Sequence, residues 1–298
     1  MARGKKTFDE AVHISPLQRG TVTAYLLGTS PLMMNRMANK AQQELLLPRR
    51  SLNKAARQMT LKHNPPEEYR NSAYRCRDDG APTFLHFPEN AFKKAMAQAA
   101  IDLEGATKAE VGRLITILDT TVHVYGKPYL DMRPVKLAGM VKTPDMRTRA
   151  ILPQWCCKIT VQYMRNKIRE QDIGNLLDAA GAIVGIGDGR TEKGTYNYGS
   201  WRVVSENDKE WHAIVKQQAR KVQEAAWNKP EAVDADTEEL LAWYYAEIIR
   251  RERDDVAPPQ GFAADEPKGR RRREPALAAR RAAPGWNKRP NGRAQAEA

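Results

Sequence analysis

The stretch GAIVGIGDGRTEKGTYNYGSWRVV, residues 181–204, places six glycines within nineteen residues and then runs into a strand-like Trp-Arg-Val-Val. Glycine lets backbone N–H groups approach an anion closely and adopts positive φ angles that larger residues resist. A phosphate-binding loop is therefore the first interpretation. A flexible connection between a helix and a strand is the alternative.

Two common phosphate loops do not fit this stretch. Gly189 and Gly194 have the spacing of a P-loop, but Thr195 follows directly where that motif needs a lysine. A dinucleotide fingerprint follows a strand and opens a helix, whereas here the helical pattern IREQDIGNLLDAAGAI comes first and the strand comes after. The loop is of another kind, and its place among the other elements must identify it.

Charge is unevenly spread over the 298 residues, whose formal net charge is +13. Residues 1–206 carry 31 Lys and Arg against 20 Asp and Glu, residues 207–267 carry 8 against 14, and residues 268–298 carry 10 against 2. The basic tail therefore explains part of the charge, and the body is basic by itself. This distribution favours a polyanion as partner.

We expect a cytoplasmic protein without a membrane contact, because no apolar run approaches about 18 residues and the charged start MARGKKTFDEAVH is unlike a signal peptide. Cys76 stands alone, and Cys156 and Cys157 are adjacent, so neither a disulfide framework nor metal-site spacing is present. The three thiols are expected to be reduced. No cofactor and no metal site are expected.

Alternating and helical periodicities predict the order β-α-β-β-α-β in the body. Strands are predicted at Thr21–Leu27, once or twice within 112–126, at 155–164 and at 200–204, and helices within 87–103 and 169–181. Two helices that cover one face of an antiparallel sheet make an α+β fold with a ferredoxin-like (RRM-like) βαββαβ core, and its other sheet face is expected to be open.

We expect three parts of the chain. The body covers residues 1–206 and holds a mainly helical basic insertion at 30–86 and a thumb-like arm at 126–154 with the apolar tip LAGMV. Two acidic helices joined across Pro230 form a helical appendage at 207–253. The Arg-, Ala- and Pro-rich residues 254–298 form a disordered basic tail.

With these elements in place, the body resembles the RAMP superfamily of CRISPR-associated proteins, and within it the backbone subunits that coat guide RNA. The glycine loop carries Gly185-Ile186-Gly187 followed by basic residues, although four residues separate it from Gly199, where that family has a second tight motif. The segment FPENAFKKAMAQAA resembles the opening of the family's first helix, with Lys94 and Ala97 as departures. LLGTSPLMMNRM resembles the passage that follows the first strand.

The resemblance, which covers about residues 1–204, implies a subunit that polymerises head to tail along single-stranded RNA, in a CRISPR-type complex with other subunits or as a phage or prophage homologue. The basic body and its aromatic residues favour nucleic acid on their own. Tyr125, Tyr129, Trp155, Tyr196 and Tyr198 are candidate stacking residues. The predicted binding residues are Lys93, Lys94, Arg133, Lys136, Lys142, Arg147, Arg149, Gly185, Gly187, Arg190, Lys193 and Tyr196.

We expect a binding protein and not an enzyme, because no paired-carboxylate or nucleophile motif is present. A single-stranded DNA-binding or annealing protein of a mobile element is one alternative, since RNA and DNA share their backbone charge. A RAMP-type RNA endonuclease is another, with His86 or Asp145 as its candidate residue. An adaptor whose basic surface meets an acidic partner is the third.

Overall fold

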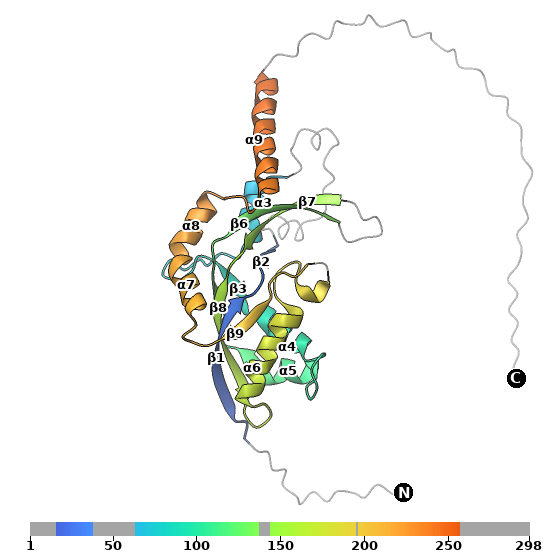
Figure 1. Cartoon of the computed structure of the whole chain (residues 1–298), viewed down its shortest axis with the longest axis vertical. Helices are drawn as coiled ribbons and strands as arrows, with labels where there is room; N and C mark the ends of the chain where they lie inside the picture. Colours follow the sequence, from blue (N-terminus) through green and yellow to red (C-terminus); the bar gives the residue numbers. More distant parts are fainter. Residues whose placement is uncertain (1–15, 38–62, 137–143, 195, 257–298) are drawn as a thin grey trace, which may run out of the picture. The chain divides into compact units, whose positions relative to one another are not determined.

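The computed structural model describes residues 16–37, 63–136, 144–194 and 196–256. The chain divides into two units, Met1–Ile249 and Arg250–Ala298, and the second unit is described as far as residue 256. The first unit has an α+β fold with two antiparallel sheets and several helices (Figure 1). Among the described residues, no helix combines the length and apolarity that a membrane crossing needs.

The larger sheet contains every strand predicted for the core. Its order is β3 (His86–Pro88), β5 (Thr121–Tyr125), β8 (Cys156–Met164), β1 (Arg19–Gly28) and β9 (Trp201–Val204), while β4 (Ile115–Ile117) also pairs with β8. All of these pairs are antiparallel. The region 112–126 therefore supplies two strands.

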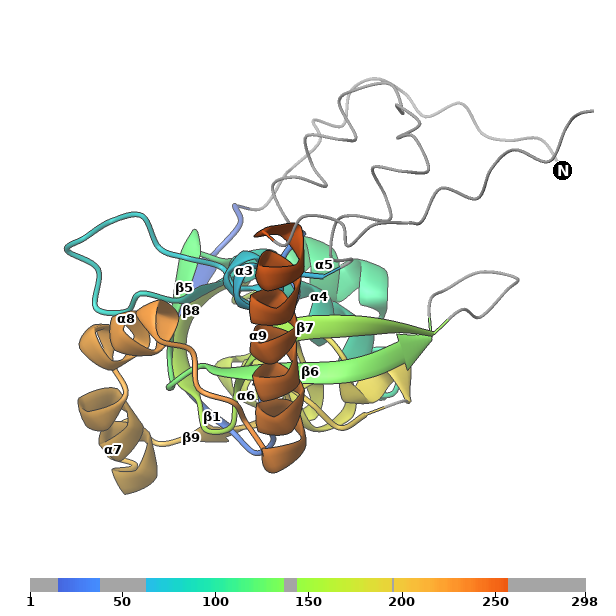
Figure 2. The same cartoon turned by 90° about the horizontal axis from the view of Figure 1, so that it is seen from above.

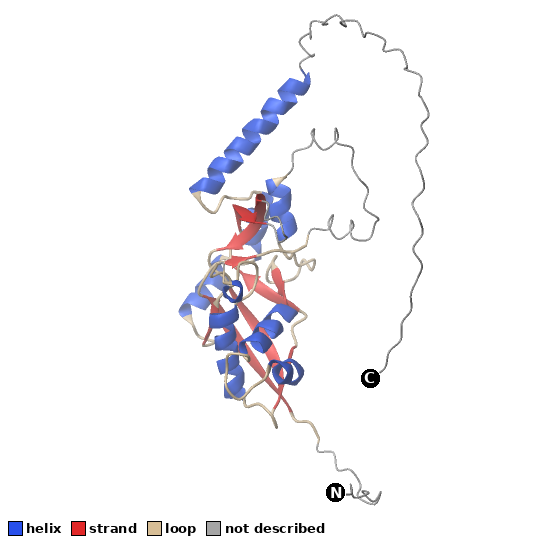
Figure 3. Ribbon diagram, turned by 90° about the vertical axis from the view of Figure 1, so that its right-hand side faces the viewer, coloured by secondary structure: helices blue, strands red, loops and turns tan. Residues whose placement is uncertain are grey.

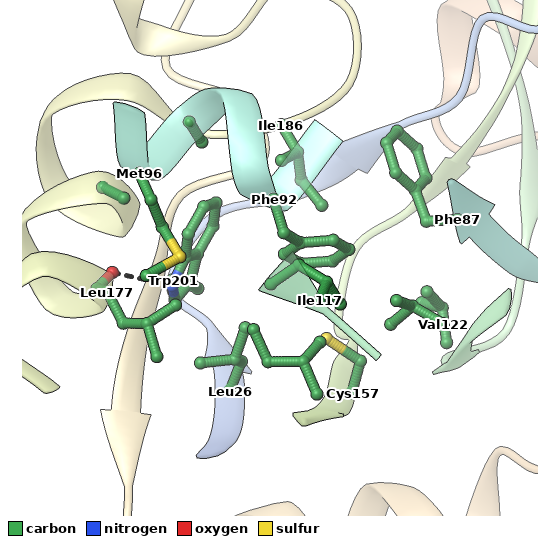
Figure 4. Close-up of a cluster of buried hydrophobic side chains, with 14 of the residues drawn as sticks. Leu26, Phe87, Phe92, Met96, Ile117, Val122, Cys157, Leu177, Ile186 and Trp201 are labelled. Atoms are coloured by element: carbon green, nitrogen blue, oxygen red, sulfur yellow. Dashed lines mark hydrogen bonds between the residues drawn. The ribbon is translucent and has the colours of Figure 1, made fainter. Parts of the chain in front are cut away.

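Helices α4 (Glu89–Ala99), α5 (Lys108–Leu114) and α6 (Glu170–Ala179) lie along one face of this sheet, and α6 continues as a π-helical turn, Ala180–Val184 (Figures 1 and 3). Phe92 and Met96 of α4 pack with Leu26, Leu177 and Trp201 in the core (Figure 4). The indole Nε1 of Trp201 donates to the carbonyl oxygen of Leu177 at 3.1 Å. Each such large side chain contributes about 1.5–3 kcal/mol by leaving water.

The opposite face of the sheet is partly covered, so the expectation of an open face is wrong there. Leu26 and Cys157 point into the main core, whereas their neighbours Leu27 and Cys156 pack against Trp211 of α7 (Lys209–Gln217). Successive residues of a strand face opposite sides, and both sides are apolar at this position. Helix α7 of the appendage therefore packs on the sheet of its own chain.

A smaller sheet in the order β2 (Leu32–Met33), β7 (Pro144–Leu152) and β6 (Tyr129–Lys136) carries the predicted arm. Strands β6 and β7 pair from Tyr129 opposite Ile151 to Lys136 opposite Pro144, and the two run side by side in Figure 2. The arm is thus a β-hairpin over these residues. Its predicted apolar tip and Lys142 lie outside the described residues.

The appendage contains α7, α8 (Arg220–Asn228) and α9 (Ala235–Val256), so the single helix predicted before Pro230 is two helices. The backbone turns at Gln218, whose carbonyl oxygen accepts the N–H of Gly126 at 3.1 Å. In α8 the fully buried amide of Gln223 accepts from the N–H groups of Phe84 and Leu85 and donates to the carbonyls of Val124 and Gly126. These four bonds satisfy the amide and fasten α8 to the end of the sheet.

The predicted insertion at 30–86 contains strand β2 and the helix α3 (Pro65–Ser72), which begins after an Asn64 side chain that accepts the N–H of Glu67. Residues 38–62 lie outside the described residues. The prediction of a mainly helical insertion therefore remains a prediction there, as does the disorder of the tail beyond residue 256.

Candidate nucleic-acid interface

A cleft of about 530 Å³ lies between α4 and the glycine loop, and we call it the α4 cleft. It brings together four of the predicted binding residues, namely Lys94, Gly185, Gly187 and Arg190. Lys108, at the start of α5, also lines it and was not predicted. The capping-box spacing of Thr107 and Glu110 was the available signal for this helix start.

The glycine loop is shaped by close backbone contacts. Gly187 has φ +84°, and a Cβ there would overlap the carbonyl oxygen of Met33. The N–H of Asp188 donates to that same carbonyl at 3.0 Å, and the N–H of Ile186 donates to the carbonyl of Gly199 at 3.0 Å. These two amides hold the loop together, so they are not the phosphate donors that the glycine pattern suggested.

Cationic side chains provide the charge of the α4 cleft instead. Lys94 is exposed, and Lys108 Nζ donates to Gln98 Oε1 at 2.7 Å. Arg190 pairs with Glu192 at 2.8 Å, and Glu192 is the one carboxylate among the described residues that line the cleft. Three cations against one anion leave the cleft positive, as the binding of a phosphate requires.

Two tyrosines stack beside the loop. The rings of Tyr196 and Tyr198 are 5.4 Å apart between centroids and 8° from parallel, and Tyr196 is 40% exposed. Arg133 donates to the Tyr198 hydroxyl at 2.5 Å and to Asp131 at 2.6 Å. Burial raises the pKa of Tyr198, so the phenol stays neutral while it accepts this bond. Tyr198 therefore supports the stacked Tyr196 ring, which is left as an exposed aromatic surface.

The arm is joined to the glycine loop by an ion pair. Arg149 of β7 contacts Asp188 at 2.8 Å, and its side chain is 16% exposed. Arg147 lies opposite Arg133 in the hairpin and is more exposed, with Asp145 at 3.9 Å. Lys136 is exposed at the end of β6. Arg149 thus positions the loop, while Arg147 remains at the surface.

Like the described cations of the arm, the remaining predicted cations Lys93 and Lys193 do not line the α4 cleft. Lys93 is half-buried on α4, and Lys193 is exposed in the short 3-10 turn Thr191–Lys193 that follows Arg190. The glycine loop and the arm meet through Arg149, but the structure does not gather all predicted cations at one point.

Of the five candidate stacking residues, Trp155 belongs to the core and Tyr125 is half-buried against it. Trp155 is fully buried, and its Nε1 donates to the carbonyl oxygen of Ser30 at 2.8 Å. Tyr125 packs edge-on against Trp211 with 6.3 Å between ring centroids. For Trp155 the expectation of a stacking role is therefore wrong. Tyr129 is half-buried with Lys127 Nζ 4.8 Å from its ring centroid.

The two candidate nuclease residues have different surroundings. Asp145 accepts from His63 Nε2 at 3.0 Å, while Nδ1 of the same ring lies 2.7 Å from Glu68. No sequence spacing suggested this contact, because His63 and Asp145 are 82 positions apart. Burial lowers the pKa of His86. Among the described residues, no group of three or more His, Cys, Asp or Glu side chains could hold a metal ion.

A scan against known protein families gives no match, and a search of the curated proteins gives none either. Among solved structures, one similar chain comes from the cryo-EM structure of the type III-B Cmr-β bound to cognate target RNA. The TM-score is 0.34 and the sequence identity is 12%, over 63% of this chain. This chain spans 59% of the length of that one. We therefore argue function from the α4 cleft, the tyrosine pair and the arm.

Proposed function

We propose that the chain is a non-catalytic subunit that binds single-stranded RNA. The observation that carries this proposal is the α4 cleft, where Lys94, Lys108 and Arg190 converge beside the glycine loop. Phosphates along the cleft would meet these cations, and an unstacked base would rest on Tyr196. A single strand suits this arrangement because its bases are free to leave the stack.

We further propose that the larger sheet is a ferredoxin-like core of the RAMP type. The order β9-β1-β8-β5 with antiparallel pairing, and with α4 and α6 on one face, supports this assignment. Since α7 covers part of the opposite face of the sheet, the bound RNA strand would run along the side formed by α4 and the glycine loop. A guide-RNA-coating backbone subunit is the form of this function that we favour.

Several copies would then follow one another along a strand. Trp243, Tyr245 and Ile249 of α9 are 64%, 50% and 50% exposed, and their burial in a contact between copies would be favourable. Residues 207–267 are acidic and the body is basic. We propose that α9 of one copy meets the basic body of the next, in a contact that does not close on itself.

Fluorescence anisotropy with a labelled single strand tests the α4 cleft directly. Lys94→Gln combined with Arg190→Gln should weaken binding at least about tenfold. The slope of log affinity against log salt concentration should become shallower by about 1.4, because two phosphate contacts are removed. Lys216→Gln combined with Lys221→Gln is the matched control, since these exposed lysines lie on α7 and α8. Binding by the first variant within twofold of the control would place the strand elsewhere.

RNA and DNA strands of the same sequence test whether the protein prefers ribose or deoxyribose. Tighter binding of RNA supports the proposal, and equal or tighter binding of DNA would support the single-stranded DNA-binding alternative. The same RNA incubated with Mg²⁺ or with chelator should remain intact. Cleavage that disappears in Asp145→Asn or His86→Gln would replace the non-catalytic function by an endonuclease.

Assembly has a separate measurement. On a strand long enough for several copies, the wild-type protein should form particles whose mass, by light scattering, rises in steps of one subunit. Trp243→Ser combined with Tyr245→Ser should still bind a short strand with wild-type affinity and load the long strand with single copies. Wild-type loading by this variant would exclude α9 as the contact.

A further inference from the structure

A second pocket, of about 440 Å³, lies between α3, the segment 73–77, strand β3 and the end of α8. We call it the arginine pocket. Four arginines line it, namely Arg36, Arg70, Arg75 and Arg77, and the described lining includes no carboxylate. It shares no lining residue with the α4 cleft.

The arginines are partly held in place by the protein. Arg70 donates to the backbone carbonyls of Trp227 and Asn228, each at 3.5 Å. The guanidinium of Arg75 lies 5.9 Å from the ring centroid of Trp227, and the backbone N–H of Arg36 donates to the carbonyl of Ser72 at 2.7 Å. The side-chain contacts of Arg70 and Arg75 are thus with neutral carbonyls and an aromatic ring. The charge of Arg70, Arg75 and Arg77 is therefore suited to an anion from outside the chain.

Aromatic and hydrogen-bonding groups stand beside these charges. Tyr74 and Trp227 are half-buried and line the pocket together with Asn71 and His86. The rings of Tyr74 and His86 are 5.8 Å apart. His86 Nδ1 is buried and has no hydrogen-bond partner among the described residues.

We propose that the arginine pocket binds a nucleotide unit, with its phosphate on the arginines and its base against Trp227 and Tyr74. Inorganic phosphate would use the charges and leave the aromatic rings without a role. A nucleotide uses both the charges and the rings, and the volume lies within the range of small-ligand pockets. An acidic peptide would satisfy the charges alone. This site is separate from the α4 cleft, where we propose that the RNA strand lies, and the inference does not depend on that proposal.

Titration calorimetry of the full chain with three probes tests the chemistry. AMP should bind more tightly than inorganic phosphate, and adenosine should bind at least about tenfold more weakly than AMP, because it lacks the phosphate. Arg75→Gln combined with Arg77→Gln should reduce the affinity for AMP at least about tenfold. Lys158→Gln combined with Lys167→Gln, two exposed lysines outside the pocket, should leave it unchanged.

Trp227→Phe separates the base from the phosphate. It should lower the affinity for AMP and leave the affinity for inorganic phosphate unaltered. Circular dichroism melting curves establish that each variant is folded, and Arg77→Gln alone replaces the double variant if that one is not. Equal affinities for AMP and adenosine, or wild-type binding of AMP by the folded arginine variant, would overturn the proposal. Binding of polyglutamate without binding of AMP would assign the pocket to an acidic protein instead.

Two sources of the nucleotide are distinguished with oligonucleotides that carry a 5′-phosphate or a 5′-hydroxyl. An affinity gain from the 5′-phosphate that Arg75→Gln and Arg77→Gln remove identifies a strand terminus. AMP binding without such a gain identifies a free nucleotide. Binding of the 5′-hydroxyl strand should depend on Lys94 and Arg190 and not on the arginine pocket, so the two proposals fail separately.

Discussion

Replacing Gly199 by alanine should destabilise the fold more than an equivalent replacement in an open loop. Gly199 has φ +68°, and an added Cβ would overlap the carbonyl oxygen of Ile186. The N–H of Gly199 also donates to the carbonyl of Pro31 at 2.7 Å, and its own carbonyl accepts the N–H of Ile186 at 3.0 Å. The glycine loop must therefore move if a side chain is added here.

Two contributions give the expected size of the effect. A left-handed backbone costs an alanine about 1–2 kcal/mol. Relief of the overlap separates Gly199 from Ile186 and weakens one or both hydrogen bonds, at about 1 kcal/mol each. The free energy of unfolding should therefore fall by about 2–4 kcal/mol.

Urea denaturation followed by circular dichroism measures this loss against two matched variants. Gly105 has φ +84° and open space around it, so Gly105→Ala should cost about 1–2 kcal/mol from the backbone conformation alone. Gly112 lies in α5 with open space and no positive φ, so its replacement should stabilise the fold by up to about 1 kcal/mol. A loss for Gly199→Ala no larger than that for Gly105→Ala would refute the close contact between the two ends of the loop.

Three further outcomes follow from the site. Tyr196→Ala should weaken RNA binding by about 1–3 kcal/mol in anisotropy measurements, because stacking needs the ring. Tyr196→Phe keeps the ring and should retain binding. An equal loss of affinity in the two variants would contradict stacking. A double-mutant cycle of Arg149→Gln and Asp188→Asn, followed by urea denaturation, should give a coupling of about 1 kcal/mol, and a coupling near zero would exclude their ion pair as a fastening of the arm. Burial lowers the pKa of His86 and of His123 below the ordinary 6.5, so the unfolded chain binds more protons as the pH falls below about 6.5. The free energy of unfolding should therefore fall with acidification, and His123→Gln should reduce that fall; an unchanged pH profile in this variant would contradict the assignment.

Local patterns predicted the elements of the core because they report which face of an element is buried. The alternation in β1 and the helical repeat through Phe92 and Met96 are of this kind. The patterns did not predict the turn at Gln218 or the burial of Gln223. Both depend on hydrogen bonds to backbone groups about 90 to 140 positions away, which no local period records.

The sequence predicted which residues carry the positive charge, but it did not predict which groups they contact. The sequence marked Lys94 and Arg190 as cations near a glycine loop, and the structure places both in one cleft. Arg149 was predicted as a phosphate contact, yet it pairs with Asp188 across 39 positions. Its role in holding the loop follows from the register of the arm and not from its charge.

The amino-acid sequence alone determined the strands and helices of the predicted β-α-β-β-α-β body, its basic charge and the glycine loop, because periodicity, charge and backbone freedom are properties of neighbouring residues. The tertiary structure decided which cations converge. It joined Lys108 to the α4 cleft and placed Trp227 beside Arg75, although they come from distant parts of the chain. The physical reason is that apolar burial brings these elements together, and the polar side chains at their edges meet as a consequence of that packing.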